Sequence, residues 1–82
     1  SLERKRNNVL AVISTKEGRE YLWELMSVTG VFQTNVATDN SAFVINGHRN
    51  AGLLILADVL NADSSAFTTM QREAKEKEAE NA

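Results

Sequence analysis

The sequence contains no cysteine and no proline, and only 6% of its 82 residues are aromatic. Without cysteine there can be no disulfide, no thiolate nucleophile and no sulfur-ligated zinc site. No apolar run approaches the ~18 residues needed to span a bilayer, and the charged segment 1–8 does not resemble a secretory leader. We therefore expect a soluble protein without a membrane span, a metal, a cofactor or a small-molecule substrate.

A strong charge of either sign is also missing, since the formal net charge is −2 at pH 7. Such a chain has no overall field that would draw it onto nucleic acid. Charge is nevertheless segregated: Arg4, Lys5 and Arg6 form a basic trio near the start, and glutamates alternate with lysines over residues 73–80. The trio is able to contact phosphate, but a solvated first helical turn is the preferred interpretation.

Apolar residues recur at helical spacing through most of the chain, and no proline interrupts them. The pattern predicts an all-α fold, a compact bundle of three to four helices with a long glycine-containing central helix. A chain of this length has room for only one core. We therefore predict a single helical domain over residues 1–77 and a charged, frayed tail over 78–82.

The second helix carries clear signals at both ends. Ser14 and Glu17 have the spacing of a capping box at its start, although Thr15 would move the start by one residue. Gly30 stands where a left-handed residue usually ends a helix, so the helix should end near Thr29.

The next segment, residues 31–40, has no helical period and is expected to be an ordered connection in which Val31 and Phe32 contact the core. Asp39 or Asn40 can cap the helix that follows.

That third helix, residues 41–61, should be the most buried element, because the run 53–57 is apolar nearly all round. Gly47 and Gly52 lie inside it, where each costs roughly 0.5–1 kcal/mol relative to alanine. A close helix crossing would compensate, with a bulky side chain lying on the small-residue patch. The candidates for that side chain are Trp23, Phe32 and Phe67.

A last helix, capped by Asn61 or Asp63, carries a short apolar stripe that should dock on the core. The stripe consists of Ala66, Phe67, Met70 and Ala74.

No group of residues suggests catalysis. His48 has no Cys, Asp or Glu at ligand spacing in its helix, so we expect neither a metal ligand nor a general base but a histidine partly packed at a helix interface. Asp58 follows an apolar run, and a buried acid needs a partner from another element, such as Arg19. Trp23 lies one step off the apolar stripe of its helix, so a place at the edge of the core is the preferred interpretation, and it is also the first residue to test at an interface.

Three segments, in this order, resemble one family: GREYLWEL at 18–25, GVFQT at 30–34 and GHRNAGLLILAD at 47–58. The chain is similar, over roughly residues 14–60, to a family of small, functionally uncharacterised proteins of short-tailed bacteriophages. The resemblance implies a phage origin. Because such genes tend to lie among those for portal, capsid and ejected proteins, it also implies a role in building or filling the particle, in the virion and in the host cytoplasm during assembly.

The resemblance further implies that four matched polar residues form a buried network between the second and third helices. These residues are Arg19, Arg49, Asn50 and Asp58. At His48 the family often carries another polar or charged residue, which weakens any catalytic role for this histidine.

Three hypotheses follow. The leading one is a non-enzymatic virion or assembly component that docks through helices onto a portal, head or ejected protein, or onto a copy of itself. The alternative is a small DNA-binding packaging or regulatory helper that uses Arg4, Lys5 and Arg6. An enzyme is the least favoured, because His48 and Asp58 would have to meet in an open pocket.

Overall fold

The computed structural model describes residues 1–32 and 40–81, without the side chains of 40–43. This part of the chain folds into four α-helices and contains no strand, which confirms the predicted all-α bundle. The helices are α1 (Leu2–Ile13), α2 (Lys16–Val28), α3 (Asn40–Ala62) and α4 (Ser64–Glu80).

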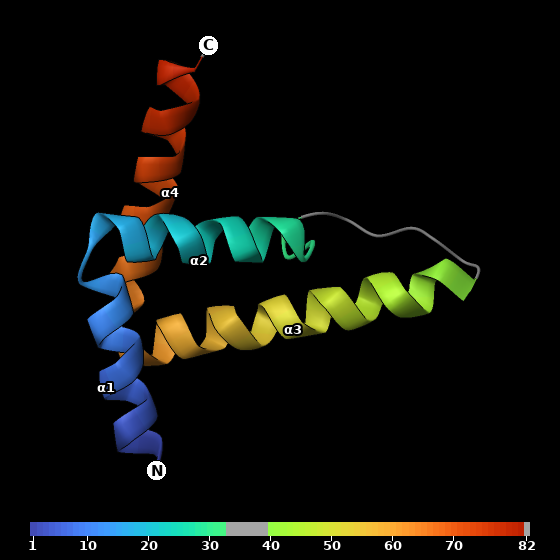
Figure 1. Ribbon diagram of the computed structural model, residues 1–82, viewed down its shortest axis with the longest axis horizontal. Helices are drawn as coiled ribbons and strands as arrows, with labels where there is room; N and C mark the ends of the chain where they lie inside the picture. Colours follow the sequence, from blue (N-terminus) through green and yellow to red (C-terminus); the bar gives the residue numbers. More distant parts are fainter. Residues whose placement is uncertain (33–39, 82) are drawn as a thin grey trace.

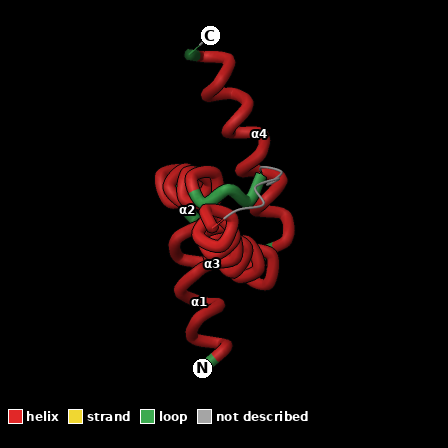
Figure 2. Tube along the Cα trace, turned by 90° about the vertical axis from the view of Figure 1, so that its right-hand side faces the viewer, coloured by secondary structure: helices red, strands yellow, loops and turns green. Residues whose placement is uncertain are grey.

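The bundle is flat. α1 and α4 run along one direction, and the two ends of the chain lie at opposite ends of the molecule (Figure 1). α2 and α3 leave this pair on the same side and run antiparallel to each other, so that the view along them is narrow (Figure 2). The extents are 41 × 40 × 16 Å, and the Cα radius of gyration is 14.1 Å. A globular domain of this length would have a radius of gyration of roughly 12 Å.

The core lies where all four helices meet, at the C-terminal end of α3. Six apolar side chains are buried there, and Met26, Val59 and Met70 are almost fully removed from solvent. The other three are Ile13, Ala62 and Ala66.

The third helix is not the most buried element, and that prediction was wrong. All residues from 44 to 51 are exposed, and Leu54 is 69% exposed. The other three helices cover α3 on one side and mainly along its C-terminal half. An apolar helix is buried only as far as its neighbours reach.

The junction between α1 and α2 corrects the predicted capping box. Ser14 keeps a helical backbone (φ −75°, ψ −17°) at the end of α1, and its hydroxyl donates to the Ala11 carbonyl at 2.7 Å. Thr15 has the extended backbone that an N-cap requires, and its hydroxyl accepts from the Gly18 N–H at 3.0 Å. The alternative start at Thr15 is therefore the correct one.

The predicted end of α2 is confirmed. Gly30 is left-handed, with φ 85°. Its N–H donates to the Ser27 carbonyl and the Val31 N–H donates to the Met26 carbonyl, each at 3.1 Å. These two bonds form a Schellman motif, which turns the chain from α2 back towards α3.

Asp63 caps α4, as one of the two predicted alternatives. Its carboxylate accepts from the Ser65 N–H at 3.0 Å and from the Ser65 hydroxyl at 2.6 Å, and these bonds lower the pKa of Asp63. The cap expected at Asp39, and the Asn40 side chain, lie outside the described residues. So does the connection over 33–39.

α4 runs to Glu80 and so includes residues 78–80 of the predicted charged tail. The backbone N–H of Asn81 closes the last turn on the carbonyls of Lys77 and Glu78. None of the described helices is long and apolar enough to cross a bilayer.

Candidate functional site: a groove between α2 and α4

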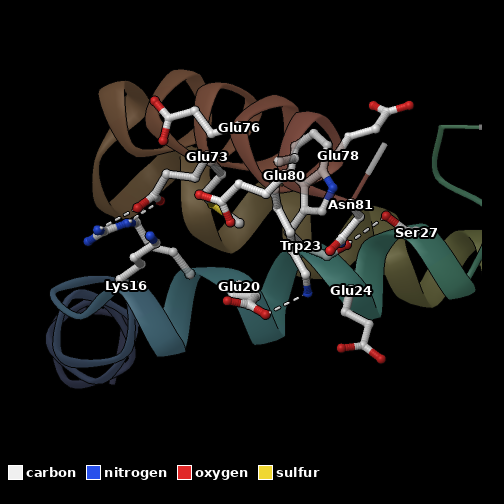
Figure 3. A pocket seen from close by; sticks show the side chains of 14 residues that line it. Lys16, Glu20, Trp23, Glu24, Ser27, Glu73, Glu76, Glu78, Glu80 and Asn81 are labelled. Atoms are coloured by element: carbon white, nitrogen blue, oxygen red, sulfur yellow. Dashed lines mark hydrogen bonds and ion pairs between the residues drawn. The ribbon is translucent and has the colours of Figure 1, made fainter.

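α2 and α4 diverge as they leave the core, and a groove of about 530 Å³ lies between them (Figure 3). We call it the α2–α4 groove. Trp23, Met70 and Ala74 supply its apolar lining, and Met70 is almost fully buried beneath it. Charged side chains of both helices form its walls (Figure 3).

A three-way contact closes the inner end of the groove. Arg19 donates to both carboxylate oxygens of Glu73, from Nε at 2.7 Å and from Nη2 at 3.0 Å, and its Nη1 donates to the Ile13 carbonyl at 3.0 Å. The two side chains are only 20% and 15% exposed. The hydrogen bond from Arg19 lowers the pKa of Glu73, and the same bond raises the pKa of Arg19, so both groups are charged at neutral pH.

A second ion pair crosses the groove further out. The Lys77 Nζ donates to Glu20 Oε1 at 2.7 Å and joins α4 to α2. This bond lowers the pKa of Glu20 and raises the pKa of Lys77. Both side chains are about half exposed, so the contact orients the walls and contributes little to stability.

The rim of the groove is acidic. Six glutamates line the groove against three basic residues, Lys16, Arg19 and Lys77. Glu24, Glu78 and Glu80 make no ion pair with any residue that the structure describes. Lys16 also lines the groove without an ion pair to a described residue, so a ligand entering the groove meets an excess of negative charge beside an apolar floor.

Trp23 joins the groove to an aromatic cluster. Its ring stacks on Phe32 at 4.6 Å between centroids and lies 5.8 Å from Phe67. Trp23 is half-buried, and Phe32 and Phe67 lie 6.3 Å apart. The interface candidate is thus held in place by its neighbours, with its ring at the groove.

The two glycines of α3 differ. A Cβ on Gly52 would collide with the side chains of Thr29 and Val31, so α3 passes close to the end of α2 at this residue. A Cβ on Gly47 would have no described neighbour within 4 Å. The expected crossing thus involves Gly52 only. The side chains that lie against Gly52 are Thr29 and Val31. None of the predicted aromatic rings lies there, because Trp23, Phe32 and Phe67 pack on one another instead.

The structure does not bring the four residues of the expected polar network together. Arg19 pairs with Glu73, and Asp58 pairs with Lys5 of α1 at 2.9 Å. The other two, Arg49 and Asn50, are exposed on the part of α3 that extends beyond the core. α2 approaches α3 only as far as Gly52, so the helical turn of α3 that precedes Gly52 is exposed to solvent.

His48 is exposed, so the expected packing at a helix interface was wrong. It lies ten residues from Asp58 on one helix, a rise of roughly 15 Å, and the two do not meet. The described residues hold no group of three acids or histidines able to bind a metal ion. The basic trio is exposed on the first turns of α1, and within it Lys5 is engaged by Asp58.

Two residues of this region escaped the sequence-based predictions. Glu73 is 54 positions from Arg19 in the sequence, so their pairing could not be predicted from local spacing. The only indication that Glu73 faces the core was its position between Met70 and Ala74 of the apolar stripe. Gly18 allows the tight junction of α1 and α2, because a Cβ there would collide with the Val12 carbonyl. The signal in the sequence for this tight junction was a glycine, Gly18, three residues after the cap Thr15.

Comparison with known proteins identifies a family. The model of the family described as Bbp19-like phage protein matches residues 9–72, which is more than half of the chain. The range includes all of α2 and the groove residues up to Met70, whereas the groove residues from Glu73 to Asn81 lie outside it. No curated protein and no solved structure matches.

Proposed function

Because this chain belongs to the Bbp19-like phage protein family, we propose that it is a non-enzymatic assembly component of the phage particle that docks through its helices. Its partner would be another particle protein, of the portal, the head or the ejected set. It would act in the host cytoplasm during assembly and remain in the virion.

The surface of the chain is the observation that carries this proposal. The accessible surface is 6042 Å², whereas a monomeric protein of this mass exposes roughly 4900 Å². The excess of roughly 1100 Å² is similar to the ~800 Å² that each partner buries in a specific interface of standard size. A chain with this much surplus surface gains stability when a partner covers it.

Five of the exposed large apolar side chains lie on α3. Leu53 and Leu60 are seven residues apart and lie on one side of the helix, and both are about 40% exposed. Leu54 is exposed on another side, and Val44 and Ile45 are exposed nearer the start. Apolar residues at such spacing on an uncovered helix are the usual anchors of helix-mediated docking.

Cross-linking mass spectrometry of purified particles and of assembly intermediates tests the proposal. We expect the chain in one or both, cross-linked to another particle protein. A double variant, Leu53→Glu/Leu60→Glu, should be lost from the particles. Both side chains are about 40% exposed, so circular dichroism of the purified variant must first show that its helix content and melting temperature are kept. Tyr21→Glu/Val28→Glu, at exposed positions seven residues apart on α2, is the matched control and should be retained. Absence of the wild-type chain from particles and intermediates alike would refute the proposal.

A further inference from the structure

We infer that the α2–α4 groove binds the basic first turns of α1 from a second copy of the chain, in a head-to-tail contact. This contact does not involve the exposed face of α3. It therefore stands apart from the docking proposed above.

The lining of the groove is complementary to an occupant with positive charge and an apolar side chain. Glu24, Glu78 and Glu80 leave its rim negative, and Trp23 and Ala74 form an apolar floor between them. In such a partly enclosed site, attraction between opposite charges is stronger than on an open surface, and like charge is repelled.

The start of α1 has both properties. Arg4 and Arg6 are exposed and make no ion pair with a described residue, whereas Lys5 is engaged by Asp58. Leu2 is 86% exposed, the most exposed large apolar side chain that the structure describes. Leu2 and Arg6 are four residues apart, so one side of the helix presents an apolar group beside a cation.

One molecule cannot make this contact with itself. The start of α1 and the end of α4 lie at opposite ends of the flat bundle (Figure 1), whose two long extents are 41 and 40 Å. Each molecule therefore offers a basic end and an acidic groove to two different neighbours. This is a heterologous contact, and its repetition produces a ring when the rotation closes and a filament when it does not.

The charges favour a protein occupant over nucleic acid, since the rim glutamates would repel phosphate. A second copy is the occupant for which the structure itself supplies the complementary charge. A basic segment of a different protein is the competing occupant, and the experiment separates the two.

A charge swap tests the contact. One variant carries Arg4→Glu/Arg6→Glu and the other carries Glu78→Lys/Glu80→Lys, all at exposed positions. Sedimentation velocity of the wild type from about 10 µM to about 200 µM should show association that weakens in high salt. Each variant alone should associate about tenfold more weakly or stay monomeric, because like charges then face each other.

An equal mixture of the two variants should associate as the wild type does, because each basic end then meets an acidic one. Lys75→Glu/Arg49→Glu changes the net charge as the first variant does, at exposed positions outside the contact, and should still associate. A wild type that stays monomeric at the highest concentration overturns the inference, as does a mixture that fails to associate. If the monomeric wild type binds a basic leucine–lysine helical peptide, seen in Trp23 fluorescence, the occupant is a different protein and the inference is also overturned.

Discussion

Arg19 on α2 holds the carboxylate of Glu73 on α4 in a two-pronged hydrogen bond, and the same guanidinium donates to the Ile13 carbonyl at the end of α1. One side chain therefore joins three helices at the edge of the core. The contact lies at the inner end of the α2–α4 groove, where α4 leaves the core.

Arg19→Lys should lower the melting temperature. A lysine ammonium cannot make the planar two-pronged bond and also reach the Ile13 carbonyl. Thermal unfolding followed by circular dichroism should show a decrease of roughly 5 °C. Arg72→Lys is the control, since the Arg72–Glu76 pair is exposed and its atoms are 3.5 Å apart, and it should change little. Equal effects of the two substitutions would mean that the Arg19 contact has no special weight.

Acid should loosen the α2–α4 groove. The hydrogen bonds from Arg19 and Lys77 lower the pKa of Glu73 and of Glu20 below the ordinary value of 4.5. A carboxylate with a lowered pKa contributes stability that is fully present above its unfolded pKa and is lost as the pH falls through its folded pKa. The melting temperature should therefore decrease below about pH 4.5.

Glu73→Gln separates this contact from general acid unfolding. It should melt at a lower temperature than the wild type at pH 7, and the difference should shrink in acid, where the wild-type Glu73 is protonated as well. A difference that stays constant from neutral pH to acid would show that the Glu73 charge is not the stabilising group.

Alanine at the two glycines of α3 should have opposite effects. Gly52→Ala places a Cβ against Thr29, whose Cβ lies 3.0 Å away, and should destabilise the fold by roughly 1–3 kcal/mol. Gly47→Ala meets no described atom and should stabilise the helix by roughly 0.5–1 kcal/mol. Urea unfolding measures both. A Gly52→Ala protein as stable as the wild type would show that α3 does not pass so close to α2.

These contacts show which features a sequence can predict. The end of α2 was predictable because Gly30 and the bonds around it involve only neighbouring residues. The burial of α3 was not, because an apolar helix has the same sequence whether its own chain or a partner covers it. Nor was the partner of Arg19, since an ion pair between distant helices depends on their crossing angles. The resemblance to phage proteins was confirmed, and it gave no information on these angles.

The true cap of α2 can be tested with two neighbouring residues. Thr15→Ala removes the hydroxyl that accepts from the Gly18 N–H and should cost about 1 kcal/mol. Ser14→Ala removes only a bond to the Ala11 carbonyl at the exposed end of α1 and should cost clearly less. Urea unfolding of both variants measures the difference. The reverse order would restore Ser14 as the cap.

DNA binding by the basic trio should be absent at physiological salt. Lys5 is paired with Asp58, so only Arg4 and Arg6 of the trio have no ion pair with a described residue. The net charge of the whole chain is −2, which does not favour DNA binding. Two or three phosphate contacts give little affinity, and counterion release makes it fall with salt at a slope of about −0.9 per phosphate. Fluorescence anisotropy with a labelled duplex should therefore show weak binding at low salt only. Suppose instead that binding persists at physiological salt and disappears in Arg4→Ala/Lys5→Ala/Arg6→Ala. That result would support the DNA-binding alternative and would overturn the assignment of Arg4 and Arg6 to the α2–α4 groove of a second copy. Docking through the exposed face of α3 is tested separately by Leu53→Glu/Leu60→Glu.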